Sequence, residues 1–308
     1  MPFDQVKADR ACAFFSMLKH TDGKFYGQPF TLLPWEEKIL RDVYGTVKED
    51  GTRQYRYIWV EVPKKNGKAL AIDTIIPTPK GWRKLDDLQV GDQVFDELGQ
   101  PCNVVAATDT MTGRPCYRMQ FANGQTIVAD ADHQWLTHTR RPEDKTKIRT
   151  THQIAASINS ANGLNHRIEL ARAVSIPERS LPLDPYLLGL WLGDGNSRDA
   201  RITIADSEPL AYLRGLGYKI EHRESFGKYG YWVKGINPIL RELDLFKNKH
   251  IPDMYLFSSI EQRLELLRGL MDSDGYCSKK GQCEFANSKK RLADGVVTLA
   301  RSLGFKAT

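Results

Sequence analysis

Two stretches of the sequence end on an aspartate followed by a glycine. DPYLLGLWLGDG ends with Asp194 and Gly195, and QRLELLRGLMDSDG ends with Asp274 and Gly275. Two carboxylates brought close together repel each other unless a cation lies between them. Mg²⁺ suits such a pair because it prefers oxygen ligands and keeps several waters. The centre could then activate water against a phosphodiester. The alternative is that each aspartate only caps a helix end, and the matching of the two copies favours the metal site.

A second candidate chemistry is phosphate binding. A predicted strand at 55–62 leads into the turn PKKNGK, which ends at Gly67 and Lys68. In such a turn the backbone N–H groups face the phosphates of ATP, and the lysine neutralises the terminal ones. A Ser or Thr should follow to bind magnesium, but Ala69 follows, and Val62 replaces the usual first glycine. Gly67 and Lys68 are therefore candidate ATP ligands in an incomplete loop.

The paired aspartates need two helices that end together, and the sequence predicts both. For the first helix, Asp184 is suited to the N-cap, Pro185 to the first helical position, and Gly195 to the stop. The second has a capping-box pattern at 258–262 and stops at Gly275. Each pattern predicts a helix whose last residue is one of the two aspartates.

Each predicted helix also carries a glycine a short distance before its aspartate. Gly189 precedes Asp194, and Gly269 precedes Asp274. Small residues let two helix backbones approach closely, so we expect the helices to pack together and bring the aspartates side by side.

The segments that follow the two aspartates also repeat. ITIADS at 202–207 returns as CEFANS at 283–288, and LGY at 216–218 returns as LGF at 303–305. An ordered repeat predicts two copies of one supersecondary unit related by a pseudo-twofold axis. The second copy lacks a counterpart of the last strand and of the helix at 238–243. We therefore expect the chain to be a C-terminally truncated fragment or one half of a split gene.

Residues after Ala69 have a different pattern, with short alternating strands separated by Gly, Asp and Pro turns. Such spacing predicts an all-β region. The predicted strands are 93–95, 103–106, 118–121 and 126–128.

Composition sets the remaining limits. A chain of 308 residues with 41% hydrophobic residues is long enough for two or three domains, and its net charge of +6 permits a polyanionic partner. No segment is apolar enough for a membrane span, so we expect a cytoplasmic protein without a membrane partner. Five scattered cysteines predict free thiols in a reducing compartment. They are Cys12, Cys102, Cys116, Cys277 and Cys283.

FTLLPWEEKILRDVYG, with a predicted helix at 32–43, and then GTRQYRYIWVEVPKKNGK resemble the start of the ATPase of a phage terminase large subunit. That family has a deviant Walker A of the form Pro-Arg/Lys-Lys-Asn-Gly-Lys-Ser. The resemblance stops at Lys68 and departs at Glu36, where the family often has Gln. It implies that the intact terminase binds ATP and has the terminase small subunit and the portal as partners. It also implies a phage or prophage protein in the cytoplasm of a bacterial host.

From Ala69 the spacing DTxI-x-TP-x-GW and then L-x-x-GD-x-V resembles the first block of an intein, which has the Hint fold. The resemblance implies an intein inserted after Lys68, at the splicing junction. GQTIVADADHQWLTHT resembles the block in which Thr-x-x-His polarises the scissile peptide, and His133 takes the histidine position while Asp130 replaces the threonine. Ala69 cannot be a nucleophile. With Trp135 it fits the class that lacks an N-terminal nucleophile, in which an internal cysteine attacks. That cysteine and the terminal His-Asn are expected beyond residue 308.

WLGDG and MDSDG resemble the two signature ends of LAGLIDADG (DOD-type) homing endonucleases. The resemblance implies a curved β-saddle on double-stranded DNA, with strands at 201–205 and 229–235, and Mg²⁺ at Asp194 and Asp274. KNKHIPDMYLF resembles a family segment in which Lys249 approaches the scissile phosphate; an ordinary surface lysine is the alternative. A basic run at 279–306 is suited to phosphate contacts.

These observations predict a multi-domain chain. Residues 1–68 would be the N-extein, a terminase ATPase start; 69–180 the N-terminal part of an all-β Hint-like splicing domain; and 181–308 a truncated α+β endonuclease of two repeats. The predicted function is protein splicing together with site-specific, metal-dependent DNA cleavage, although the truncated chain should neither splice nor hydrolyse ATP. The alternatives are a DNA-packaging motor without an active intein and a DNA-binding protein that does not cleave.

Overall fold

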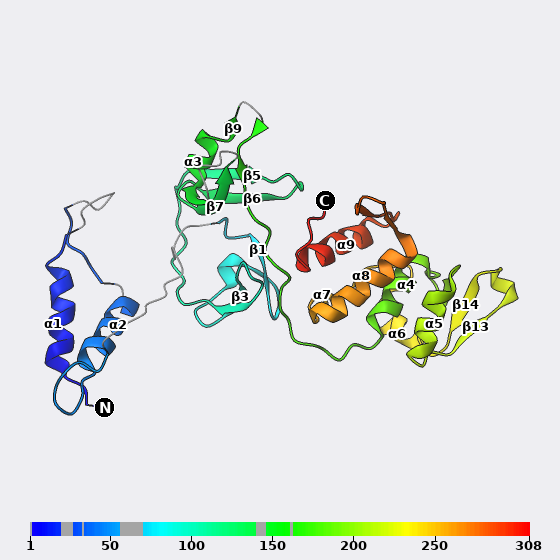
Figure 1. The fold of residues 1–308 in the computed structure, drawn as a ribbon, viewed down its shortest axis with the longest axis horizontal. Coiled ribbons are helices and arrows are strands. Elements are labelled where there is room, and N and C mark those ends of the chain that lie inside the picture. The colour runs from blue at the N-terminus through cyan, green and yellow to red at the C-terminus, as the bar shows by residue number, and fades with distance from the viewer. Residues whose placement is uncertain (1, 20–26, 33, 56–69, 140–145, 161–162) are drawn as a thin grey trace. The chain divides into compact units, whose positions relative to one another are not determined.

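The structure is a computed structural model. It describes residues 2–19, 27–32, 34–55, 70–139, 146–160 and 163–308, shown in colour in Figure 1. The chain forms two compact units, Met1–Lys64 and Lys65–Thr308.

Two helices form the described part of the N-terminal unit, α1 (Gln5–Ser16) and α2 (Pro34–Gly45). The helix predicted at 32–43 is confirmed as α2, two residues later at each end. Its start at a proline is favourable because the first helical N–H has no intrahelical partner. The predicted strand at 55–62 lies almost entirely outside the described residues, as do Gly67, Lys68 and Ala69.

The second unit begins with short antiparallel strands. The hairpins β1–β2, β3–β4, β5–β6 and β9–β10 accompany a three-stranded sheet in the order β11-β7-β8. One short helix, α3 (Thr151–Ala156), begins with a capping box at Thr150. The strands are β1 (Ile75–Thr78), β2 (Gly81–Lys84), β3 (Gln93–Phe95), β4 (Pro101–Asn103), β5 (Cys116–Gln120), β6 (Thr126–Asp130), β7 (Gln134–Thr139), β8 (Lys147–Thr150), β9 (Asn159–Ser160), β10 (Gly163–Leu164) and β11 (His166–Arg167).

The β-rich prediction for this region is correct, and β3 has its predicted bounds. The strand predicted at 103–106 is placed wrongly, because β4 ends at Asn103. Gly99, with φ of 77°, makes the tight turn that pairs Phe95 with Pro101 and Gln93 with Asn103. The turn therefore sets the register and starts the strand two residues early. β5 likewise begins two residues earlier than predicted, and β6 ends two residues later.

The rest of the unit alternates helices with short strands, and most of the core lies here. The two copies of the predicted repeat appear as α4–β12–α5 and α8–β15–β16–α9, and β12, β14 and β13 form one antiparallel sheet in that order. The elements are α4 (Pro185–Asp194), β12 (Arg201–Thr203), α5 (Ser207–Gly215), β13 (Ile220–His222), β14 (Gly230–Val233), α6 (Asn237–Glu242), α7 (Asp253–Leu256), α8 (Ile260–Asp274), β15 (Gly275–Cys277), β16 (Cys283–Phe285) and α9 (Lys290–Ser302).

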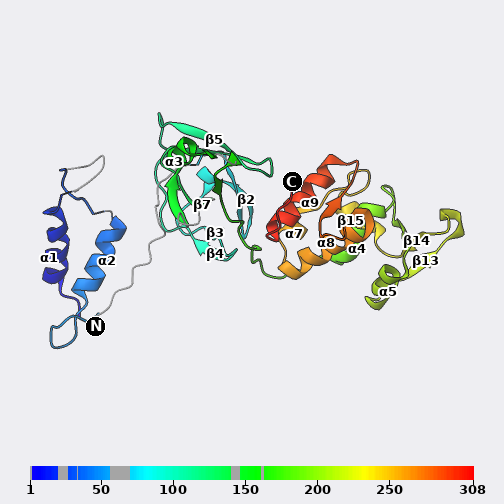
Figure 2. The ribbon, with the colours of Figure 1, turned by 45° about the horizontal axis from the view of Figure 1, so that its top comes forward.

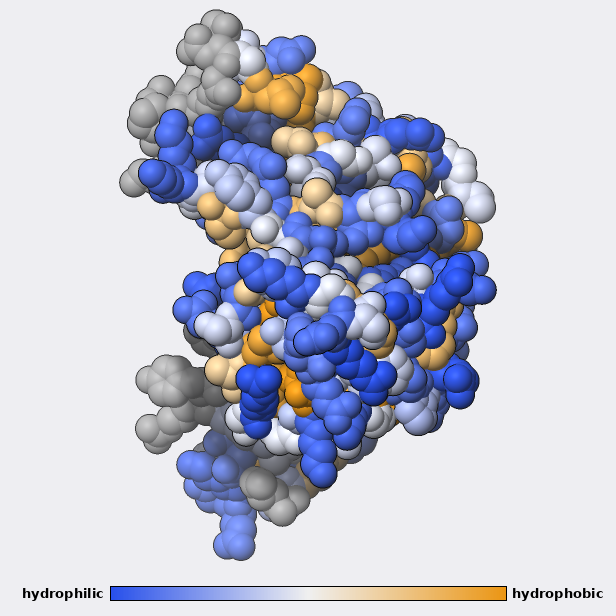
Figure 3. All heavy atoms as spheres, turned by 90° about the vertical axis from the view of Figure 1, so that its right-hand side faces the viewer, coloured by the Kyte–Doolittle hydropathy of each residue, from blue (hydrophilic) through white to orange (hydrophobic). Residues whose placement is uncertain are grey.

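Helix α4 is the centre of this core. It is apolar on every side, and its residues from Tyr186 to Leu192 are all buried. Such a helix must be surrounded by other elements. Figures 1 and 2 both show α4 beside α8. Figure 3, which looks from the side of the β13–β14 hairpin, shows a surface covered mostly by hydrophilic residues.

Candidate functional site

Helices α4 and α8 meet backbone to backbone at two glycines. A Cβ added to Gly189 would lie 2.4 Å from the carbonyl oxygen of Leu266, and one added to Gly269 would lie 2.2 Å from that of Tyr186. Both distances are far below van der Waals contact, so neither position has room for a side chain. The predicted close approach of the two helices is confirmed.

The helix caps are also those predicted. Asp184 accepts a hydrogen bond from the backbone N–H of Leu187, and Ser259 forms a capping box with Gln262. Helix α4 ends at Asp194 and helix α8 at Asp274, each followed by a glycine. The local sequence thus determines where each helix starts and stops.

The crossing brings the two aspartates to one place. A Cβ on Gly193 would lie 3.5 Å from Cγ of Asp274, so the end of α4 lies directly against that carboxyl group. The pKa of Asp194 is raised, first by partial desolvation and second by the charge of Asp274. The two carboxylates therefore repel each other electrostatically, as the sequence predicts.

Lys249 is held at the same place. Its ammonium group donates to the carbonyl oxygens of Gly193 and Gly195, at 2.9 and 2.7 Å, and lies 5.1 Å from the ring centre of Trp191. Partial burial lowers its pKa to about 8, although Asp274 and Asp194 oppose the shift. The alternative of an ordinary surface lysine does not fit these contacts.

Asn287, at the beginning of the segment before α9, completes the surroundings of Asp274. Its side-chain amide donates to Oδ2 of Asp274 at 2.7 Å. The sequence contained a signal for this residue, since Asn287 lies inside the repeated CEFANS segment. The repeat predicts two copies of one structural unit, but it does not by itself predict the contact between Asn287 and Asp274.

The carboxylate pair fits a magnesium ion in number and kind of ligand. Mg²⁺ commonly binds through one or two carboxylates and completes its shell with water and phosphate oxygens. Among the residues that the structure describes there is no group of three or more His, Cys, Asp or Glu side chains placed to hold a metal. Two oxygen-bearing side chains therefore favour a hard, largely hydrated ion over a fully enclosed one.

His133 and Trp135 lie together in the β-rich part of the unit. Their ring centres are 4.7 Å apart in an edge-to-face arrangement. The Trp135 indole N–H donates to Oγ1 of Thr151 at 2.9 Å, and that hydroxyl donates in turn to the carbonyl oxygen of His133 at 3.2 Å. Trp135 is thus connected through Thr151 to the backbone that carries His133. Sequence analysis did not identify Thr151.

The start of the β-rich region lies along strand β6. Leu70 forms an antiparallel bridge with Ala129, and the N–H of Ala71 donates to the carbonyl oxygen of Val128. The residue directly after Ala69 is therefore paired with the strand that leads to Asp130 and His133.

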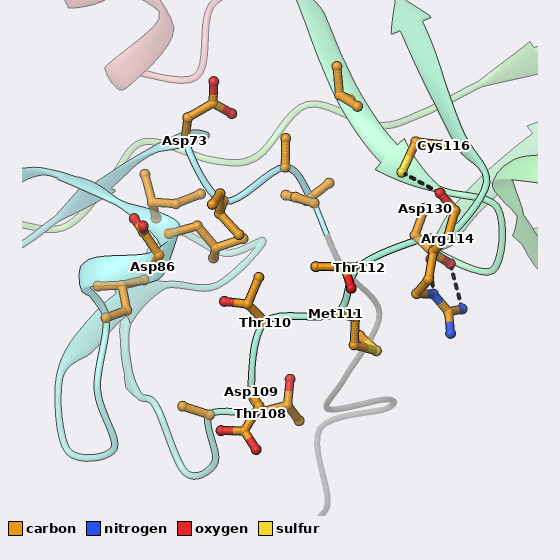
Figure 4. Close-up of a pocket in the computed structure, with 18 of the residues that line it drawn as sticks. Asp73, Asp86, Thr108, Asp109, Thr110, Met111, Thr112, Arg114, Cys116 and Asp130 are labelled. Carbon is orange, nitrogen blue, oxygen red and sulfur yellow. Dashed lines mark hydrogen bonds and ion pairs between the residues drawn. The ribbon is translucent and has the colours of Figure 1, made fainter.

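A cavity of about 1030 Å³ lies beside this pairing. Figure 4 shows the side chains of Asp73, Asp86 and Cys116 around it and the ion pair between Arg114 and Asp130. Asp130 is 1% exposed, and the guanidinium of Arg114 binds both of its oxygens. The carboxylate that replaces the expected threonine is therefore stabilised by a charge-assisted bidentate contact. Arg114 was not identified from the sequence.

The prediction of free thiols is wrong for two of the five cysteines. Cys277 and Cys283 form a disulfide, whereas Cys12, Cys102 and Cys116 are free. The cause is the β15–β16 hairpin, in which Cys277 is paired directly with Cys283. The sequence spacing alone did not reveal this register.

Residues 250–308 match the family model for homing endonucleases. This match covers α7, α8 and α9, and therefore Asp274 and Asn287. The segment with the second aspartate is thus similar in sequence to homing endonuclease domains.

Similar proteins include the replicative DNA helicase DnaB of Mycobacterium intracellulare. It is 40% identical over 260 residues, which cover 78% of this chain and 43% of that protein. The homothallic switching endonuclease of Saccharomyces cerevisiae is 29% identical over 160 residues, which cover 40% of this chain and 27% of that protein. This chain spans less than half the length of either relative.

Among solved structures, the chain is similar to one described as the Msm DnaB1 intein splicing domain bound with zinc. The identity is 42%, the match covers 32% of this chain and 73% of that chain, and the TM-score is 0.26. The family model and the yeast relative together support a homing endonuclease domain in the C-terminal part of the chain.

Among the described residues, no helix has the length and apolar character needed to cross a bilayer.

Proposed function

We propose that the chain is part of a precursor in which an intein interrupts a host protein and contains a site-specific DNA endonuclease. The observation that carries this proposal is the convergence of Asp194, Asp274 and Lys249 at one end of the α4–α8 crossing. Residues 1–68 would be the host segment, 69–180 the splicing region and 181–308 the endonuclease.

In the proposed cleavage reaction, Asp194 and Asp274 would be the residues that hold Mg²⁺, and each carboxylate would serve one DNA strand. The bound ion would supply a water of lowered pKa and would polarise the phosphate. Lys249, fixed by two carbonyl oxygens, would face the scissile phosphate and stabilise the negative charge that develops there. In each strand the attacking water would form one new P–O bond, and the P–O bond to a sugar oxygen would break, with that oxygen taking up a proton and leaving as a hydroxyl group.

Double-stranded DNA is the proposed partner because basic residues outnumber acidic ones in the C-terminal segment. The segment 279–306 holds seven basic and two acidic residues. In the β13–β14 hairpin, Arg223 lies over the rings of Phe226 and Trp232. Basic groups beside strands favour contacts with the phosphate backbone. DNA binding without cleavage is the alternative that the endonuclease test addresses.

In the proposed splicing reaction, His133 donates a hydrogen bond at the Lys68–Ala69 peptide and protonates the leaving nitrogen. The contact between Trp135 and Thr151 supports this proposal, because it orients the backbone of His133. Ala69 offers no nucleophile, so an internal cysteine would attack the Lys68 carbonyl and form a thioester as the Lys68–Ala69 bond breaks.

For the host protein we propose a phage terminase large subunit, on the sequence of residues 1–68. Gly67 and Lys68 would bind ATP only after splicing, in the cytoplasm of the bacterial host. The small subunit and the portal would then be partners of the spliced product alone. A second candidate is a DnaB helicase, favoured by the relative from Mycobacterium intracellulare. Its match covers 78% of this chain and 43% of that protein.

The test of the endonuclease uses a supercoiled plasmid that carries the host gene without the intein. With Mg²⁺ we expect a double-strand cut near the codon of Lys68, and no cut in a plasmid whose gene retains the insertion. Asp194→Asn and Asp274→Asn should each abolish the double-strand cut while DNA binding remains. Binding without any Mg²⁺-dependent nicking by the unaltered protein would contradict the proposal.

The reading frame after the insertion distinguishes the two proposed host proteins, since a terminase resumes there with Ser or Thr and then a Walker B strand.

A further inference from the structure

The two aspartates differ in their surroundings. Oδ2 of Asp274 accepts a hydrogen bond from the amide nitrogen of Asn287 at 2.7 Å. The backbone adds a second link, because the N–H of Ala286 donates to the carbonyl oxygen of Asp274 at 3.2 Å. Asp274 is therefore connected to the strand that returns beside it through both its side chain and its main chain.

The amide of Asn287 is itself fixed in orientation. Its Oδ1 accepts from the backbone N–H of Lys289 at 2.9 Å, directly before α9. Since the amide oxygen has that donor, the amide nitrogen must face Asp274 and cannot exchange places with the oxygen. One oxygen of Asp274 is thus held by a donor of fixed direction, and Oδ1 remains for a ligand.

The first copy of the repeat has Asp206 where the second has Asn287, because ITIADS is matched by CEFANS. A carboxylate only accepts hydrogen bonds when it is ionised, so Asp206 cannot donate to Asp194 as Asn287 donates to Asp274. Asp206 is instead the exposed N-cap residue of α5. The two copies of the repeat therefore differ in the side chains beside Asp194 and Asp274.

We propose that Asn287 is a positioning residue that orients Asp274 for the metal ion, so that the second copy offers a better ordered carboxylate than the first. The inference rests on the proposed DNA cleavage. It adds that Asp194 and Asp274 differ in how well each carboxylate is ordered for metal binding. A ligand that is oriented in advance loses less freedom when the ion binds. Outer hydrogen bonds to metal ligands commonly change affinity by about 10- to 100-fold. The strand served by Asp274 should therefore be cut first, and a nicked intermediate should accumulate.

The first experiment measures binding of Tb³⁺, an oxygen-preferring ion, by its luminescence in the DNA-free protein. Trp191 is a suitable sensitiser because its ring centre lies 5.1 Å from Lys249 Nζ. Asn287→Ala should weaken binding by about tenfold, and Asp274→Asn should weaken it more. Gln282→Ala is the matched control, because Gln282 makes the same kind of amide-to-carboxylate bond, to Glu284, in the neighbouring hairpin. It should leave Tb³⁺ affinity unchanged.

A second variant and thermal unfolding show whether a loss of Tb³⁺ binding comes from misfolding or from the lost orientation of Asp274. If Asn287→Ala does not fold, Asn287→Ser, whose hydroxyl is too short to reach Asp274, makes the same test. A variant with an unchanged melting temperature and weaker Tb³⁺ binding supports the inference. Unchanged affinity in a folded Asn287 variant, with affinity lost in Asp274→Asn, overturns the inference and leaves the proposed function intact. Unchanged affinity in Asp274→Asn would overturn both.

The second experiment follows the order of strand cleavage on a linear duplex that carries the same target site, with each strand labelled at its own 5′ end. The unaltered protein should cut one strand first, and Asn287→Ala should slow that strand by about tenfold while the other changes less. The proposed difference between the two aspartates would be overturned if Asn287→Ala slowed the cleavage of both strands equally. It would also be overturned if the unaltered protein cut both strands at the same rate.

Discussion

Gly189 of α4 and Gly269 of α8 face each other's helix backbones at the point where the two helices cross. Each lacks room for a single added carbon, since the nearest carbonyl oxygens would lie 2.4 and 2.2 Å from it. The crossing therefore depends on the absence of a side chain at both positions. Because Asp194 and Asp274 end these helices, the same two glycines determine how closely the carboxylates approach.

The first prediction concerns this crossing. Gly189→Ala and Gly269→Ala should each reduce the free energy of unfolding by about 1–3 kcal/mol, because the added methyl group forces the backbones apart. Urea unfolding measures the change. Gly215→Ala is the matched control, since Gly215 lies in α5 with nothing within 4 Å of an added Cβ. It should leave stability unchanged or raise it by about 0.4–1 kcal/mol. An equal effect at Gly189 and Gly215 would contradict this account.

The second prediction is a pH dependence caused by Lys249. Its pKa is about 8 in the folded protein, below the usual value of 10.5. Between these values the unfolded chain binds more protons than the folded one, so the contribution of Lys249 to stability increases as the pH rises from 8 to 10.5. The full change is at most about 3 kcal/mol. Below pH 8 both states are protonated, and the contribution is constant.

Lys249→Met isolates this effect, because the variant keeps the length of the side chain and removes the titrating group. Urea unfolding of both proteins without metal, from pH 7 to pH 10, gives two curves of stability. The unaltered protein should gain stability relative to the variant above pH 8. Parallel curves would show that Lys249 titrates at its ordinary value.

The third prediction concerns Arg263, which is fully buried in α8. Its guanidinium donates to carbonyl oxygens of Ser258 and Ser302, at 3.0 and 2.7 Å, and also to that of Val174. Burial lowers its pKa to about 10, so it remains charged at neutral pH. Arg263→Met would leave these buried oxygens without their donor and should destabilise the protein by about 3 kcal/mol.

Urea unfolding measures the loss at Arg263, and proteolysis around Val174 tests whether that segment is released. Arg214→Met, at the exposed end of α5, is the control and should change stability by less than about 0.5 kcal/mol. A stable Arg263→Met protein with unchanged proteolysis would show that the buried guanidinium is dispensable.

The fourth prediction concerns Trp135. Trp135→Phe keeps an aromatic ring but removes the hydrogen bond to Thr151, and should cost about 1 kcal/mol of stability. In a complete precursor the variant should also splice more slowly, because the backbone of His133 is less well oriented. Thr151→Val should have the same effect. The double variant should be little worse than either single variant, since both remove one connected contact.

Additive effects of the two substitutions on the splicing rate would contradict this coupling. Trp82→Phe is the control for the loss of an indole ring. Trp82 is 44% exposed, so its replacement should affect neither the splicing rate nor the stability beyond a few tenths of a kcal/mol.

Local features of the sequence were good predictors where short-range physics decides the structure. The caps at Asp184 and Ser259 were predicted because capping depends on neighbouring residues, and the repeat predicted the glycine contact because matching positions meet at a twofold crossing. The strand predicted at 103–106 was misplaced because its register depends on the turn at Gly99. The pairing of Cys277 with Cys283 was missed for the same reason.

The sequence by itself determined which residues end the two helices, which glycines permit their crossing, and which residue types can do chemistry. Only the tertiary structure decided that Lys249 binds the carbonyl oxygens at the end of α4, that Arg114 pairs with Asp130, and that Asn287 holds Asp274 but not Asp194. The first group depends on neighbours along the chain. The second depends on contacts between separate elements, from 13 residues apart for Asn287 and Asp274 to 56 residues apart for Lys249 and Gly193, which form only when hairpins and helices pack together.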